Sequence, residues 1–185
     1  MNHTRQRELQ AERTNAVARW SLLRDVIIAG GLVGTLGALV MAALALLLGA
    51  ITHGDPWYAP RLVGGVFFRD APTGAAAVVL GLVLHFATAG GIGTAFALML
   101  PRGGTALAAL MLGLLMGLAL QALMPTLVIP WASPPLARAG PPVAALLLLH
   151  LAFGACLAIV TPVRDVLSAA DAKRRDLQAL LTRRA

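Results

Sequence analysis

Four long stretches of the chain contain no Asp, Glu, Lys or Arg. They cover residues 26–51, 74–100, 105–129 and 143–163, and each is between 21 and 27 residues long. A helix of about 20 residues crosses the hydrocarbon core of a bilayer, so every stretch is long enough. In lipid the backbone must satisfy its own polar groups, and the low content of β-branched residues disfavours a barrel. The pattern predicts an all-α, four-helix transmembrane bundle.

The composition supports a membrane protein over a soluble one. Hydrophobic residues make up 58% of the 185-residue chain and charged residues 12%, against roughly 25% in soluble domains. The net charge of +7 does not indicate nucleic-acid binding, because no basic face is interleaved with aromatic residues. The first stretch is longer than the roughly 7–15 apolar residues of a signal peptide, so we expect it to be retained as a span.

The basic residues are divided unevenly between the two faces that four spans would define. Residues 1–25, the turn at Arg102 and residues 164–185 together hold twelve Lys and Arg residues. The other two loops hold three, which are Arg61, Arg69 and Arg138. The positive-inside rule therefore predicts that both termini are cytoplasmic.

The two outer loops predict different structures. In the first, Asp55 followed by Pro56 is typical of a helix cap with proline at the first helical position. We expect a short helix on the outer face there. Five aromatic side chains should anchor the outer loops at headgroup depth: Trp57, Tyr58, Phe67 and Phe68 in the first loop and Trp131 in the second. The second loop, Pro130-Trp131-Ala132-Ser133-Pro134-Pro135, is rich in proline and predicts a stiff cap without regular helix.

Both ends of the chain have amphipathic patterns. Residues 1–25 form a cytoplasmic N-terminal segment and residues 164–185 a basic tail, on either side of the bundle at 26–163. In the tail, Leu and Val recur at near-helical spacing between basic residues. We expect both segments to lie at anionic headgroups, with docking to a protein as the alternative.

Small residues recur four positions apart in every span. The pairs are Gly30 with Gly34, Ala87 with Gly91, Gly113 with Gly117, and Gly154 with Ala158. Small-xxx-small faces let helix backbones approach closely in lipid. They predict packing within the chain, with contacts in a homo-oligomer as the alternative.

Three polar side chains inside the spans are the candidate site. His85, Gln121 and His150 are predicted to lie at comparable depth, in the outer half of the membrane, on three different helices. Intramembrane ionisable groups usually face the interior of a bundle and point to function. Structural hydrogen bonding is one hypothesis for the cluster. Haem b ligated by His85 and His150 is another, and a third is a soft-metal or proton site using Met116, Met124 or Cys156.

The sequence holds no recognisable catalytic motif. Gly-x-Ser-x-Gly and His-Glu-x-x-His are absent, and all three serines lie outside the spans. We therefore expect a non-catalytic accessory or assembly subunit of a larger membrane complex. The alternatives are a small b-type cytochrome and a subunit of a small-solute transporter or channel.

Two sequence features carry a family resemblance. Leu-Val-Leu-His-Phe-Ala at 82–87 is similar to Leu-Leu-Leu-His-Leu-Ala at 147–152, and Gly-Asp-Pro-Trp-Tyr-Ala-Pro-Arg occupies the first outer loop. With these motifs, residues 32–163 resemble small four-span bacterial proteins of uncharacterised function. The resemblance implies a four-span fold and a bacterial inner membrane, and it implies no activity, ligand or catalytic residue.

Overall fold

The computed structural model describes residues 20–101 and 103–182, and every regular element in these ranges is helical. Four helical stretches are long and apolar enough to cross a membrane: Leu23–His53, Gly74–Met99, Ala106–Ala132 and Val143–Thr182. The prediction of four apolar helices is thus confirmed at this level. Of the predicted N-terminal segment 1–25, residues 1–19 lie outside the described residues.

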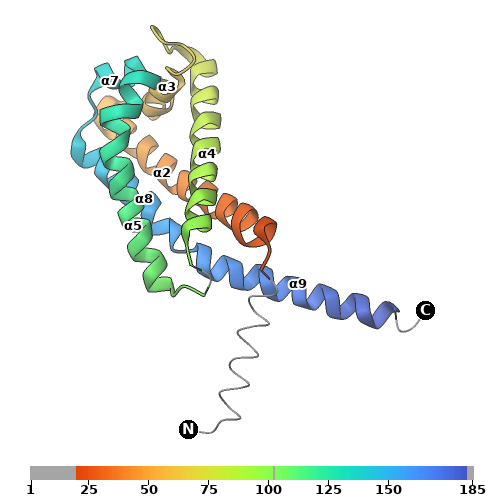
Figure 1. The fold of residues 1–185 in the computed structure, drawn as a ribbon. Coiled ribbons are helices and arrows are strands. Elements are labelled where there is room, and N and C mark those ends of the chain that lie inside the picture. The colour runs from red at the N-terminus through yellow and green to blue at the C-terminus, as the bar shows by residue number, and fades with distance from the viewer. Residues whose placement is uncertain (1–19, 102, 183–185) are drawn as a thin grey trace.

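Two of the long helices match the charge-free stretches closely. The first begins with a π-helical turn, η1 (Leu23–Ile28), and continues as α2 (Ala29–His53). The second, α4 (Gly74–Met99), ends one residue before the predicted end at residue 100. Figure 1 shows α2 crossing beside α4, and α5 running beside α8 on the other side of the molecule. Helix α2 also contacts α8 and so joins the two pairs.

Prolines interrupt the other two helices. Helix α5 (Ala106–Leu123) passes into a π-helical turn, η2 (Met124–Val128), and then into α6 (Ile129–Ala132). Pro125 lies in η2, and because proline has no N–H and its ring crowds the preceding turn, a widened turn accommodates it. The predicted third span at 105–129 therefore contains a change of helix type near its C-terminal end.

The fourth predicted span, 143–163, is not one continuous helix. Helix α8 (Val143–Leu157) ends six residues early, and α9 (Val160–Thr182) follows it in a different direction (Figure 1). The amides of Ala158 and Ile159 bond three residues back, to the carbonyls of Ala155 and Cys156 at 3.2 and 3.0 Å. Pro162 cannot donate to the carbonyl of Ala158, which explains why the helix breaks at that point.

The first outer loop folds close to its prediction. A short helix, α3 (Tyr58–Gly64), is present, but it starts two residues after Pro56. Asp55 accepts a hydrogen bond from the Trp57 amide at 2.9 Å and pairs with Arg61. The aspartate therefore forms a turn ahead of the helix, and the prediction that it caps a helix beginning at Pro56 is wrong.

The prediction of a second outer loop without regular helix is also wrong. Helix α7 (Pro134–Ala139) occupies it, with prolines at its first two positions. Proline is tolerated there because the first helical amides have no partner inside the helix. Ser133 Oγ donates to the carbonyl of Leu62 in α3 at 2.7 Å, which joins the two outer loops.

Candidate functional site

Glycine contacts bring the helix backbones together around the polar residues. In α5 and α8, Gly113 and Gly154 face one another so closely that a Cβ on either would overlap the carbonyl of the other. Gly117 lies in the same way against the carbonyl of His150. These contacts agree with the prediction that small residues form packing faces within the chain.

The α2–α4 contact uses a different face of α4 from the predicted one. Gly30 and Gly34 of α2 pack against the backbone of Gly93 and Ala89, respectively. Gly91 is exposed, and a Cβ there would meet nothing within 4 Å. The prediction that Gly91 packs within the chain is therefore wrong, because α4 turns Ala89 and Gly93 toward α2.

His150 and Gln121 meet, as expected. His150 is buried at 6% exposure, and its Nδ1 lies 2.9 Å from both Gln121 Oε1 on α5 and the carbonyl of Leu146, one turn earlier in α8. A carbonyl oxygen can only accept, so Nδ1 carries the hydrogen and donates to both oxygens. The ring is thereby held in one orientation.

His85 makes a different contact. Its Nε2 lies 3.1 Å from the carbonyl of Ala38 on α2, and the same reasoning makes Nε2 the donor. The imidazole of His85 also meets the ring of Phe86 edge-on at 5.7 Å between centroids. The structure therefore brings together two of the three predicted residues, and it bonds the third to the backbone of a neighbouring helix.

These contacts fit structural hydrogen bonding best among the three hypotheses for the cluster. Haem ligation would need a free ring nitrogen on His85, and the Nε2 of His85 is instead bonded to the carbonyl of Ala38. Along the described ranges, no group of three or more His, Cys, Asp or Glu residues is arranged to hold a metal ion. His85, Gln121 and His150 thus bond to the chain's own helices.

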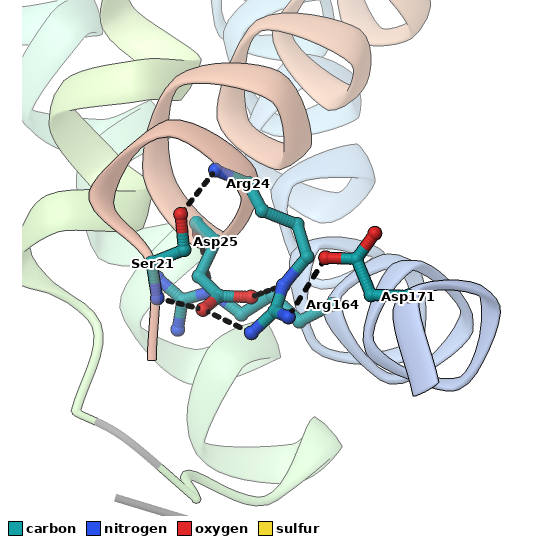
Figure 2. Close-up of polar contacts among 5 residues, drawn as sticks. All are labelled: Ser21, Arg24, Asp25, Arg164 and Asp171. Atoms are coloured by element: carbon teal, nitrogen blue, oxygen red, sulfur yellow. Dashed lines mark hydrogen bonds and ion pairs between the residues drawn. The ribbon is translucent and has the colours of Figure 1, made fainter. Parts of the chain in front are cut away.

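A second polar cluster lies where α2 begins and α9 passes it (Figure 2). Arg24 and Asp25 form a two-pronged ion pair, with Nε–Oδ1 and Nη2–Oδ2 distances of 2.7 Å. Their side chains are only 11% and 5% exposed. Arg24 Nη1 also reaches Asp171 of α9, 3.1 Å from Oδ2. The pair therefore links the start of the first apolar helix to the C-terminal helix.

Ser21 explains why this helix starts where it does. Its Oγ accepts from the Arg24 amide at 3.4 Å, and its own amide donates to Asp25 Oδ2 at 2.8 Å. Such a reciprocal arrangement is a capping box, in which an acidic residue is placed one position later than usual. The run Ser-Leu-Leu-Arg-Asp at 21–25 is the sequence signal for this capping box. The sequence analysis counted Arg24 only among the basic residues that predict membrane orientation.

Arg164 completes the cluster from α9. Its Nε donates to the carbonyl of Asp25 at 2.7 Å, and its two terminal nitrogens reach the carbonyls of Ala97 and Leu100 at the end of α4. Carbonyls at a helix end have no partner within the helix, and a guanidinium satisfies several at once. Arg164 therefore fastens α9 to the ends of both α2 and α4.

The predicted aromatic anchors are mostly exposed. Trp57 is 46% exposed, Phe67 53%, Phe68 37% and Trp131 79%. Tyr58 is half-buried and stacks on His53 with ring centroids 3.7 Å apart. These residues lie in or beside the two loops that carry α3 and α7, and Figure 1 shows α3 and α7 at the end of the molecule away from α9.

Comparison with known families, with characterised proteins and with solved structures finds no match to this chain. The fold by itself defines the class: an all-helical protein with four helices apolar enough to cross a membrane, as in a multi-pass membrane protein.

Proposed function

We propose that this chain is a non-catalytic accessory or assembly subunit of a larger complex in a bacterial inner membrane. The observation that carries the proposal is the bonding of the intramembrane polar groups. His150, Gln121 and His85 bond to each other or to backbone carbonyls, so they build the scaffold and do not line a reaction site. An enzyme or an ion pathway needs such groups to face a substrate or water.

The outer surface of the helices supports a role in contacts. Large apolar side chains on α2, α4 and α5 are more than half exposed, including Leu39, Val83, Leu98 and Leu115. Lipid covers such a surface, and so can the helices of another membrane protein. In this proposal the four helices form a bundle across the bilayer, and α3 and α7 lie at its outer interface with their aromatic side chains among the headgroups.

The orientation follows from the charges. Both termini are cytoplasmic in this proposal, because residues 1–25, position 102 and residues 164–185 hold twelve of the fifteen Lys and Arg residues of the sequence. The ionic cluster of Ser21, Arg24, Asp25, Arg164 and Asp171 then lies at the inner face.

Purification of the tagged chain from its native membranes in a mild detergent tests the proposal. We expect a second membrane protein to co-purify in fixed stoichiometry, and an unrelated tagged four-span protein serves as the control. A Gly34→Leu variant places a side chain against the Ala89 carbonyl, so it should disrupt the α2–α4 contact and lose the partner. A chain recovered alone, with turnover of its own or with a haem Soret band, would contradict the proposal.

A further inference from the structure

Helix α9 has an apolar face that the rest of the described chain leaves exposed. Val166, Leu177, Leu180 and Leu181 are each more than half exposed and follow helical spacing. The same helix carries exposed basic side chains at Lys173, Arg174 and Arg175. Figure 1 shows α9 extending past the ends of the other helices. A helix with one apolar face and flanking basic residues suits a membrane surface.

An apolar groove between α2 and α9 indicates which way this face points. The groove has a volume of about 280 Å³ and is lined by Leu32 of α2 and by four residues of α9, namely Pro162, Val163, Val166 and Leu167. Leu32 is 57% exposed on the first apolar helix, so its outer side faces acyl chains in the proposed placement. Because Val166 lines the same groove and begins the apolar face of α9, that face is turned toward the lipid.

The ionic cluster fixes the rotation of α9 about its own axis. Arg164 and Asp171 are seven residues apart, which is about two helical turns, so they lie on the same side of the helix. This side is bonded to η1 through Arg24 and the carbonyl of Asp25, and to the end of α4 through the carbonyls of Ala97 and Leu100. The apolar face is on another side and cannot turn inward without breaking these bonds.

We propose that α9 is a docking helix for anionic phospholipid. Its apolar side chains insert beside the acyl chains while Lys173, Arg174 and Arg175 contact the headgroup phosphates. Residues 164–185 hold six basic and three acidic residues, a charge that favours a negative surface. Lys173 lies four residues before Leu177, on the apolar side, and its long stem lets the ammonium reach the headgroups. The inference rests on the membrane placement proposed above.

A fluorescent probe on α9 in the full chain tests the proposal. Cys156 is the only cysteine, so a Cys156→Ala background accepts a single new thiol at Leu177→Cys on the apolar face or at Thr182→Cys away from it. The labelled protein is reconstituted in phosphatidylcholine vesicles with increasing phosphatidylglycerol. We expect the probe at 177 to lose quenching by aqueous iodide as phosphatidylglycerol rises, while the probe at 182 stays accessible.

The basic residues are tested by neutralisation. The triple variant Lys173→Gln, Arg174→Gln, Arg175→Gln should weaken docking roughly a hundredfold, so that much more phosphatidylglycerol is needed for the same protection. The matched control is Arg69→Gln with Arg138→Gln, which removes exposed charges at the other end of the molecule and should leave the titration unchanged. Equal iodide quenching at 177 and 182 in anionic vesicles overturns the proposal.

Two further outcomes also overturn it. If residue 177 is protected equally in neutral and in anionic vesicles, and equally with and without the triple substitution, recognition of anionic lipid is excluded. Protection that appears only when native membrane proteins are added would make α9 a protein-docking helix. A probe at Leu39→Cys separates this test from the membrane placement, since quenching of that probe by lipid-attached quenchers supports the spans whatever α9 does.

Discussion

The molecule has two polar clusters, and they are bonded in contrasting ways. Within the apolar helices, His150 and Gln121 form a neutral contact between α5 and α8. Around η1, a charged network joins η1, α4 and α9 through the side chains of Arg24, Asp25, Arg164 and Asp171. The neutral contact is made between helices that glycines already hold together. The charged network instead bonds η1 and the end of α4 to α9, the long helix that has the fewest other contacts with the described chain.

The charged network gives Arg24 and Arg164 a structural role in addition to their place in the charge count of the positive-inside rule. Arg24 and Arg164 both count toward the positive-inside pattern, yet each is largely occupied by carboxylates or carbonyls of the chain. Lys173, Arg174 and Arg175 are exposed, and of the three only Arg174 has an ion pair within the described chain, 3.9 Å from Asp171. Substitutions should therefore cost most in the charged network and least at the neutral contact.

Asp25→Ala should have the largest effect. It removes the two-pronged partner of the buried Arg24, and loss of one member of a buried ion pair costs about 3 kcal/mol or more of unfolding free energy. Denaturation with SDS in mixed micelles, followed by circular dichroism, measures the loss. Asp171→Ala is the matched control, because Asp171 is 34% exposed and its removal should cost about 1 kcal/mol or less. Equal losses would show that burial of the pair is unimportant.

Arg164→Lys should come next. An ammonium keeps the charge but cannot span the carbonyls of Asp25, Ala97 and Leu100 at once, so we expect a loss of about 2 kcal/mol. Limited proteolysis of α9 provides a second measurement, since the released helix should be cleaved faster. Arg175→Lys, at an exposed position farther along the same helix, should change neither quantity. If Arg164→Lys changes neither the unfolding free energy nor the rate of proteolysis, a positive charge alone is enough to hold α9 in place.

Gly113→Ala tests the packing beneath the neutral contact. The added methyl group meets the carbonyl of Gly154, and overpacking of this kind costs about 1–3 kcal/mol. Gly91→Ala adds the same methyl group on the open face of α4, where it should leave stability unchanged or raise it slightly. A loss at residue 91 as large as that at residue 113 would indicate that Gly91 packs against a second copy or a partner.

Hydropathy predicted the helices better than their ends. The stretch 74–100 agrees with Gly74–Met99 because loops with charge and glycine bound it on both sides. The break after Leu157 was not predicted, because the apolar run continues through Pro162. A proline inside an apolar helix can kink it, break it or leave it continuous, so its presence alone does not predict a break. The early start at Leu23 was missed because Arg24 and Asp25, as charges, were assigned to the flank.

For the polar residues, sequence spacing predicted the level along the helices at which the side chains lie, but not the neighbour toward which each side chain points. His85, Gln121 and His150 were predicted at one level, and the contact between His150 and Gln121 agrees with that. The direction of His85 depends on how α4 is rotated against α2, which Gly93 and Ala89 decide by packing on Gly30 and Gly34. Sequence reasoning chose the face with Ala87 and Gly91, so it could not foresee the bond to Ala38.

Gln121→Leu should have the smallest effect of the four. His150 Nδ1 donates to two oxygens, and the Leu146 carbonyl still accepts from it when the amide is gone. Hydrogen bonds between helices in lipid contribute about 0.6 kcal/mol on average, so we expect a loss near that value. A double-mutant cycle with His150→Leu isolates the coupling between the two side chains, and both variants are measured by the same SDS denaturation. A coupling of several kcal/mol would contradict this, because it would make the neutral contact as strong as the buried ion pair and reverse the order of the two clusters.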